Sequence, residues 1–324
     1  MATFLETTVT GNVSASSNVS SSNVNATLEI ILKRNDTPAT PAVNTLTIFA
    51  ESVASRMLLA QIGPSGQQTP FQPHIARNKI GYWAASVLTA NAATGPLSFG
   101  IPAPTIVAAG TVYTARVPAT TSRVNRLRRI GVTSLSTASS VASYRSATNQ
   151  FTLGNGIGAG GFTYIHRFAV ADSAAMTKAN MFLGLNTVTA AATNVIPSTI
   201  VNSIGVGCDQ NSNNFQLYYG GSAAQTPINL NTSGNFLANN LNDMFELCLF
   251  SPTIHANTAN TVIYYRFEKV DTTNANVING VIEGPATVLP SNTTLLGIQN
   301  WRTNAGLTAN CGIDLISLYI ETDN

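Results

Sequence analysis

Hydrophobic and polar residues alternate most sharply over residues 244–270, where two runs rich in aromatic and β-branched residues flank a polar segment. In the first run, Phe245, Leu247 and Leu249 share one face. The opposite face carries a single carboxylate, Glu246. Alternation with a period of two and one apolar face is typical of a strand that is buried on one side. The two runs therefore predict a long antiparallel hairpin.

The same signal recurs along the chain, in short apolar runs that Gly, Asn and Pro separate and that show no helical periodicity. So many short strands predict an all-β fold, a two-sheet antiparallel sandwich. Upstream of it, residues 45–52 and 56–63 predict a separate hairpin. The further strands expected in the sandwich are residues 161–170, 181–185, 203–207, 215–219, 277–283, 295–299 and 313–321.

The chain divides into three expected regions. Residues 7–27 are a low-complexity segment, which has too little apolar surface to offset the entropy of ordering it and needs a partner outside itself. We therefore expect residues 1–66 to be a small β-rich region for anchoring and oligomerisation. Residues 67–122, rich in Pro and Ala, predict a partly extended connector, and residues 123–324 the sandwich domain.

Composition changes this picture in one respect. Only 9% of the residues are charged, compared with roughly 25% in an ordinary soluble domain. Hydrophobic content is an ordinary 44%, so Asn, Thr, Ser, Gly and Ala replace the missing charges and solubility depends on amides and hydroxyls. The net charge of +2 argues against a disordered chain. Such a surface is typical of extracellular adhesins and of virion proteins that pack through extensive contacts.

Neither membranes nor cofactors are indicated. No segment approaches the ~18 consecutive apolar residues of a membrane span, and no basic segment followed by an apolar stretch predicts a signal peptide. Cys208, Cys248 and Cys311 each lie in or beside an apolar run and are expected to be free thiols. Cys and His show no metal-ligand spacing, so we expect no metal and no cofactor.

The chain contains one cluster of charge, formed by Arg123, Arg126, Arg128 and Arg129. Such a cluster can bind phosphate or an acidic glycan. No aromatic or Gly-rich nucleic-acid motif accompanies it, which favours a junction where the guanidinium groups bond backbone carbonyls or a neighbouring subunit. Nucleic acid is therefore not an expected partner.

Several segments resemble virion structural proteins of tailed bacteriophages, of the kind called tail-fibre or receptor-binding proteins. The segments are IGPSGQQTPFQPHIARNKIGYW at 62–83, RLRRIG at 126–131, GGFTYIHRF at 160–168, NVIPSTIVNSIGVG at 194–207, LYYGGSAAQTPINL at 217–230 and ISLYIETDN at the end. The resemblance implies a concanavalin A-like jelly roll in the C-terminal part and an N-terminal part bound to other virion proteins. It also implies three identical subunits, a homotrimer.

Concanavalin A-like folds also include glycoside hydrolases, whose two catalytic carboxylates commonly come from a Glu-x-Asp-x-x-Glu strand. No such run occurs in this chain. Glu246 and Glu268 can lie across the hairpin from each other, but Arg266 and Lys269 offer them ion partners. A Glu246–Arg266 pair across the hairpin is expected, and no catalytic residue is. We therefore expect a protein without enzymatic activity.

Glycan binding calls for exposed aromatic rings beside amide groups. The candidates by residue type are Tyr218, Tyr219, Asn300, Trp301 and Arg302, with core packing as the alternative for the aromatic rings.

Two other polar residues have structural interpretations. His166 shares a strand face with aromatic residues and is expected to be a hydrogen-bonded structural histidine. Asp209 begins a segment of alternating oxygen-bearing side chains that is similar to a calcium loop. The segment has one carboxylate and no terminal Glu, which favours a turn.

These observations predict a phage virion fibre protein. Its N-terminal part would attach to the particle, and its lectin-like C-terminal domain would be exposed for attachment to a host-surface glycan. The alternative is a capsid or tail decoration protein that stabilises the virion without a receptor role.

Overall fold

The hairpin predicted most strongly by the sequence lies near one edge of a large sheet in the computed structural model. It consists of β15 (Met244–Ser251) and β16 (Thr261–Lys269), paired with Phe245 opposite Lys269 and Leu249 opposite Tyr265. The hairpin prediction is confirmed. The structure describes residues 38–42, 45–53, 56–63, 68–70, 79–86, 95–108, 114–116, 118–122, 124–270 and 276–322.

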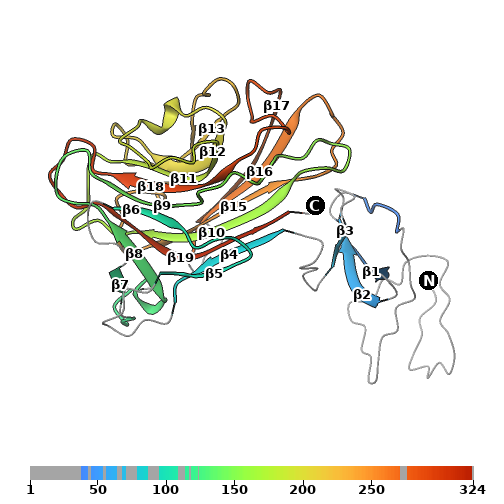
Figure 1. The fold of residues 1–324 in the computed structure, drawn as a ribbon, viewed down its shortest axis with the longest axis horizontal. Helices are drawn as coiled ribbons and strands as arrows, with labels where there is room; N and C mark the ends of the chain where they lie inside the picture. Colours follow the sequence, from blue (N-terminus) through green and yellow to red (C-terminus); the bar gives the residue numbers. More distant parts are fainter. Residues whose placement is uncertain are drawn as a thin grey trace.

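Two antiparallel sheets form the body of the protein, stacked as two layers (Figure 1). Sheet I has the order β17-β16-β15-β10-β19-β4-β5, and in addition β8 pairs with β19 and β7 pairs with β8. Sheet II has the order β14-β13-β12-β11-β18-β9-β6. The other strands of sheet I are β4 (Ile80–Ala84), β5 (Leu97–Phe99), β7 (Thr114–Arg116), β8 (Arg129–Thr133), β10 (Phe162–Val170), β17 (Val277–Gly284) and β19 (Gly312–Glu321). Those of sheet II are β6 (Thr105–Ala108), β9 (Val141–Arg145), β11 (Asn180–Asn186), β12 (Ser203–Cys208), β13 (Gln216–Gly220), β14 (Ile228–Asn229) and β18 (Gly297–Thr303).

The strand pairing is that of a jelly roll. Strand β8 pairs with β19 in sheet I, and the strands next to them in sequence, β9 and β18, pair in sheet II. The chain therefore crosses from one sheet to the other as a two-stranded ribbon that closes around a common core. The predicted all-β, two-sheet antiparallel sandwich is confirmed. The regular helices in the described residues are two single 3₁₀ turns, η1 (Val124–Arg126) and η2 (Pro197–Thr199).

The sandwich begins earlier in the chain than the sequence indicated. Strands β4 to β7 lie within residues 67–122, the segment predicted as a connector, and they pair with β19, β4, β9 and β8 respectively. Each is three to five residues long, too short for an alternating pattern to be recognised. Trp83 shows that β4 belongs to the core, because its ring is fully buried and its Nε1 donates to Pro102 O at 2.9 Å.

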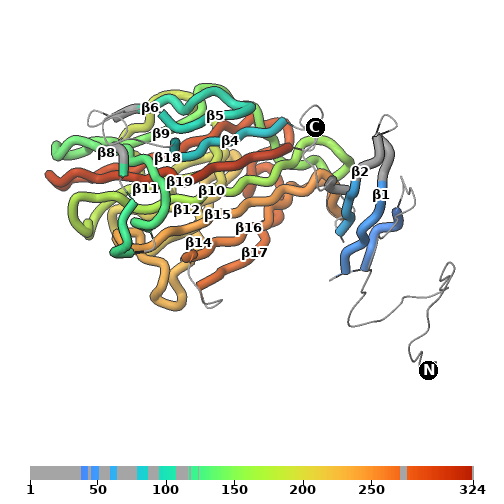
Figure 2. The backbone as a smooth tube through the Cα atoms, turned by 90° about the horizontal axis from the view of Figure 1, so that it is seen from below, coloured from blue at the N-terminus to red at the C-terminus, as the bar shows by residue number. Residues whose placement is uncertain are grey.

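A separate three-stranded sheet precedes the sandwich. It has the order β1-β2-β3, from β1 (Thr47–Val53), β2 (Arg56–Ile62) and β3 (Gln68–Pro70). The predicted upstream hairpin is therefore confirmed, and Phe49, Ala60 and Ile62 form its small core. Figures 1 and 2 show this sheet beside the sandwich. The low-complexity segment 7–27 lies outside the described residues, and its anchoring role stays a prediction.

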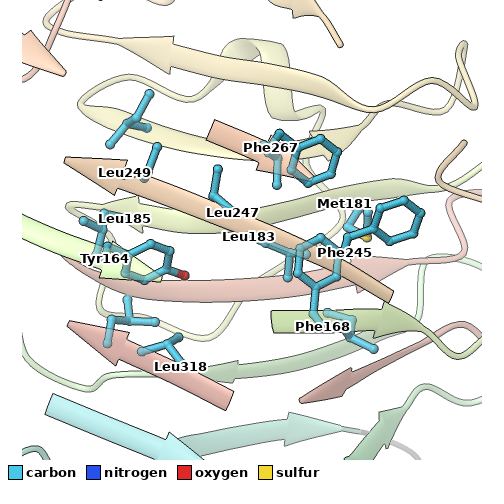
Figure 3. Packing of buried hydrophobic residues seen from close by; sticks show 14 of the residues in the cluster. Tyr164, Phe168, Met181, Leu183, Leu185, Phe245, Leu247, Leu249, Phe267 and Leu318 are labelled. Carbon is cyan, nitrogen blue, oxygen red and sulfur yellow. The ribbon is translucent and has the colours of Figure 1, made fainter. Parts of the chain in front are cut away.

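Aromatic rings from both layers meet in the core of the sandwich. Phe168, Phe245 and Phe267 extend from sheet I, and the ring of Phe215, which precedes β13 of sheet II, lies 4.7 Å from Phe245 and 5.0 Å from Phe267 between centroids. Figure 3 shows the rings of sheet I beside the aliphatic side chains of β11 and β15. None of the helices in the described residues has the length and apolarity to cross a membrane.

His166 lies within this core as a hydrogen-bonded residue. Its Nε2 contacts Tyr144 Oη at 2.9 Å and its Nδ1 contacts Tyr164 Oη at 3.3 Å, so one tyrosine donates to the neutral ring and the other accepts from it. Burial lowers the pKa of His166 to about 3 and raises the pKa of both tyrosines. The predicted structural role of His166 is confirmed.

Acid should therefore weaken the fold through His166. Between about pH 6.5 and 3 the unfolded chain binds a proton that the folded chain does not, so the free energy of unfolding falls as the pH falls through that window. Urea titrations of wild type from pH 7 to 4 should show this decrease, and the His166→Gln variant should show a shallower one. An unchanged slope in His166→Gln would contradict the assignment.

Candidate ligand pocket on the outer face of sheet II

Three aromatic residues gather on the outer face of sheet II, away from the main core. They are Phe182 on β11, Tyr218 on β13 and Trp301 on β18. The rings of Phe182 and Trp301 stack with centroids 6.4 Å apart. Tyr218 Oη donates to Gln216 Oε1 at 2.7 Å, and burial raises the pKa of this tyrosine. The cluster forms an apolar floor on one side of the sandwich.

Gly205 makes room for this floor. It lies on β12, between Gly184 of β11 and Tyr218 of β13 in the strand register. A Cβ atom at Gly205 would approach the tip of the Phe182 ring to 2.9 Å and Leu183 O to 2.4 Å. A glycine therefore lets the ring lie close over the neighbouring strand.

The segment between β11 and β12, residues 187–202, covers part of the floor, and we call it the pocket loop. Its Ala192 and Ile200 pack against the aromatic cluster. Asn194 anchors it, because its Oδ1 accepts from Asn180 Nδ2 at 3.0 Å and from Thr303 Oγ1 at 2.7 Å, while its Nδ2 donates to a serine hydroxyl at 3.2 Å. The loop is therefore held at the end of the sheet where β11 begins and β18 ends.

A pocket of about 270 Å³ lies between the pocket loop and the sheet. This volume is near the lower end of the range of small-molecule sites, about 300–1,000 Å³. The lining is mainly apolar, with several amides and hydroxyls. The lining residues are Asn186, Thr187, Val188, Ala191, Ala192, Thr193, Val195, Thr199, Ile200, Val201, Gln299 and Trp301.

Two amide side chains in the pocket, those of Gln299 and Asn186, each have one polar atom that makes no hydrogen bond to a described residue. Gln299 Nε2 donates to the loop carbonyls of Val188 and Ala190, which leaves Oε1 without a hydrogen bond to any described residue. Asn186 Oδ1 accepts from Val188 N at 2.9 Å, and its Nδ2 likewise has no partner in the described chain. The pocket thus offers an acceptor and a donor beside an indole ring.

The five glycan-binding candidates are divided between the two faces of sheet II. Trp301 lines the pocket with only 3% of its surface exposed. Tyr218, 1% exposed, lies in the same outer cluster, so its ring is packed as the alternative expected. Tyr219 packs against the main core, and Asn300 and Arg302, adjacent to Trp301 in sequence, are buried on the inner face. Neighbours along a strand point to opposite faces, so sequence adjacency grouped residues that the fold separates. Applying the same alternation from Trp301 leads to Gln299, which the sequence analysis missed.

Arg302 has a structural partner in the sandwich interior. Its Nε and Nη2 atoms bind Asp172 Oδ1 and Oδ2 at 2.7 and 2.6 Å, with both side chains almost completely buried. Asp172 Oδ1 also accepts from Gly312 N at 3.0 Å. Burial opposes the charge on Arg302, but Asp172 raises its pKa, so the guanidinium stays protonated. Arg302 therefore does not contribute to the pocket.

The three cysteines are free, as predicted. Burial raises the pKa of Cys208 and of Cys311 to about 11, so both thiols are protonated near neutral pH. Among the described residues, no group of three His, Cys, Asp or Glu side chains could hold a metal ion. Asp209 Oδ1 accepts from Asn211 N at 2.7 Å, which is the turn geometry expected for that segment.

Two arginines of the basic cluster, Arg126 and Arg129, make contacts within the fold. Arg129 binds Asp314 Oδ2 and the carbonyl oxygen of Val124, both at 2.7 Å. Arg126 donates to Thr120 O at 3.4 Å, whereas Arg128 is exposed and Arg123 lies outside the described residues. Bonding to backbone carbonyls is what the junction interpretation predicted for these residues.

The two carboxylates considered for catalysis are engaged in ion pairs. Glu246 and Glu268 lie directly opposite each other on β15 and β16. Glu246 pairs with Arg167 and with Arg266, the latter at 3.4 Å, and Arg266 also pairs with Glu268. The predicted Glu246–Arg266 pair is confirmed.

No protein-family model and no curated protein matches the chain. Among solved structures, it is similar to a peanut lectin with a nonamer peptide, at 10% identity and a TM-score of 0.40, over 65% of this chain and 90% of the lectin. It is also similar to the Lotus tetragonolobus seed lectin, at 11% identity and a TM-score of 0.35, over 65% of this chain and 92% of that one. A third similarity is to the CBM2 module of the evolved Dit of Lactobacillus casei BL23 phage J-1, at 13% identity and a TM-score of 0.35, over 75% and 96%.

Likenesses at these identities and TM-scores carry no inference about ligands or partners. The functional argument therefore rests on the residues of this chain.

The assignment of Arg302 to the fold predicts a large effect of its partner on stability. The Asp172→Asn variant should lose about 3–5 kcal/mol of unfolding free energy, because a buried guanidinium is left uncompensated. The matched control is Glu283→Gln, the same change at an exposed carboxylate, which should stay within about 0.5 kcal/mol of wild type in urea denaturation. A small effect of Asp172→Asn would contradict the structural role of the pair.

Proposed function

We propose that the protein is a non-enzymatic, glycan-binding fibre protein of a phage virion, and that the pocket of sheet II is its binding site. The observation that carries the proposal is the indole of Trp301 beside Gln299 Oε1 and Asn186 Nδ2. An apolar ring can stack on the C–H face of a sugar, while an amide acceptor and donor bond its hydroxyl groups. A mainly apolar lining with few polar atoms is the usual composition of such sites.

The virion part of the proposal is supported by the sequence. The resemblance to tail-fibre proteins extends over most of the chain beyond residue 45, and the small sheet β1-β2-β3 precedes the sandwich as a separate unit with its own core. In this proposal the N-terminal region binds other virion proteins and the sandwich is directed toward the host surface. A decoration protein without a receptor role would lack a functional pocket.

The non-enzymatic part is supported by Glu246 and Glu268. Both carboxylates are held by arginines on the outer face of sheet I, a different sheet from the one that carries the pocket. A retaining glycosidase needs one carboxylic acid with a raised pKa and one free nucleophile. Both carboxylates already have arginine partners, so neither is a free nucleophile.

Glycan binding should depend on Trp301. Purified protein should bind oligosaccharides from the host surface, and Trp301→Ala should weaken binding at least tenfold, because the stacking surface is removed. The control is Tyr264→Ala, which removes an exposed ring from sheet I and should leave binding unchanged. Absence of binding by wild type to any host glycan would contradict the proposal, and release of sugar fragments would contradict its non-enzymatic part.

Self-association should accompany this function. Tyr82, Leu97 and Phe99 lie next to one another on β4 and β5 of sheet I, and they are 38%, 59% and 51% exposed. Contiguous exposed apolar side chains favour association, and threefold symmetry is the form implied by the resemblance to fibres. Sedimentation should show a trimer of the 34.0 kDa chain. A monomer would contradict association, and a dimer would contradict its symmetry.

A further inference from the structure

Arg145 lies beside the pocket, and its guanidinium group is buried without hydrogen-bond partners for two of its nitrogen atoms. It is on the outer face of sheet II, where β9 places it directly opposite Gln299 of the pocket and Ser143 opposite Trp301. The residue is only 8% exposed. Its Nε and Nη1 atoms are buried without a hydrogen-bond partner anywhere in the described chain. Buried unsatisfied groups are rare in folded proteins and usually have a functional reason.

Arg145 forms no ion pair with a carboxylate in the described part of the chain. None of the strands of sheet II contains Asp or Glu, and neither does the pocket loop. The other deeply buried arginine on this sheet, Arg302, is paired with Asp172 through two hydrogen bonds. A buried charge without a partner destabilises a fold, so a guanidinium in this position is suited to binding an anion that the chain itself does not supply.

A second unpaired atom lies in the same corner of the sheet. Asn149 Oδ1 is buried without a partner, while its Nδ2 donates at 2.8 Å to the carbonyl of Thr187, a pocket residue. Asn149 Oδ1 lies against Gly297, which is opposite Asn186 in the register. A ligand that satisfies both unpaired groups needs an oxyanion for Arg145 and a hydroxyl donor for Asn149.

We propose that the pocket selects acidic sugars, and that Arg145 binds their carboxylate or phosphate group while the sugar ring lies against Trp301. The planar fork of a guanidinium matches the two oxygens of either group. This inference rests on the proposed function, because it names the class of glycan that the same pocket takes. It assigns specificity to Arg145 and general affinity to Trp301.

The test compares sugars that differ only in charge. Binding of glucose, glucuronate and glucose 6-phosphate, and of galactose and galacturonate, is measured by titration calorimetry on the full chain. At least one acidic sugar should bind wild type ten times more tightly than its neutral counterpart. The uronates and the sugar phosphate separate a carboxylate ligand from a phosphate ligand. Equal binding within every set would overturn the proposal.

Variants then separate the roles of the residues. Arg145→Met should abolish the preference, so that acidic and neutral sugars bind with equal affinity, and Arg145→Lys should restore part of the preference. Arg128→Met removes the same charge at an exposed position and should have no effect. Because the Nε and Nη1 atoms of Arg145 have no partner among the described residues, Arg145→Met should not lower the midpoint of urea denaturation. A lower midpoint would indicate a structural role and overturn the proposal.

The outcomes distinguish this inference from the proposed function. Trp301-dependent binding of neutral and acidic sugars with equal affinity would leave the glycan site in place and reject Arg145 as its specificity residue. Acidic ligands that bind through Arg145 but are insensitive to Trp301→Ala would support an anion site and reject the glycan pocket. No binding of any sugar, neutral or acidic, would reject both.

Discussion

The rest of the structure depends on the burial of two apolar sheet faces against each other. The rings of Phe168, Phe245 and Phe267 on one sheet meet Phe215 from the other layer, and this contact fixes which strands face each other. Once the inner faces are fixed, strand alternation decides what every neighbouring residue does. Trp301 points outward because Asn300 and Arg302 point inward. Packing of the core thus places Trp301 on the outer face of sheet II, where it lines the pocket.

Polar groups inside the sandwich add specificity to this packing. A buried ion pair such as Arg302–Asp172 contributes little net stability relative to apolar residues, because both charges lose their hydration. A slipped register would separate the two charges and leave each unpaired, which is far more costly. His166, bonded to a tyrosine of sheet II and to one of its own strand, penalises displacement of the layers in the same way. These residues therefore select one arrangement of the strands.

Alternation over long runs allowed the sequence to predict the fold class, the hairpin of β15 and β16, and the approximate position of most strands from β10 onward. The short strands β4 to β6 were missed, because three to five residues cannot show a period and their place is determined by pairing with distant strands such as β19. The candidate site was predicted only in part. Trp301 was found by residue type, whereas Asn186, Gln299 and Arg145 come together through sheet register and a loop, which no local pattern encodes.

Charge is distributed unequally between the two sheets. Strands of sheet I carry carboxylates, and two of these, Glu246 and Asp314, pair with arginines. The strands of sheet II contain no carboxylate, and in the proposed site recognition would depend on amides, hydroxyls, an indole and one guanidinium. A single cation in an otherwise uncharged and partly buried surrounding is weakly screened, so its attraction for an anion is stronger than on an ordinary charged surface. In the proposed site, the scarcity of charge that first distinguished the sequence is therefore the condition under which one arginine would decide which ligand binds.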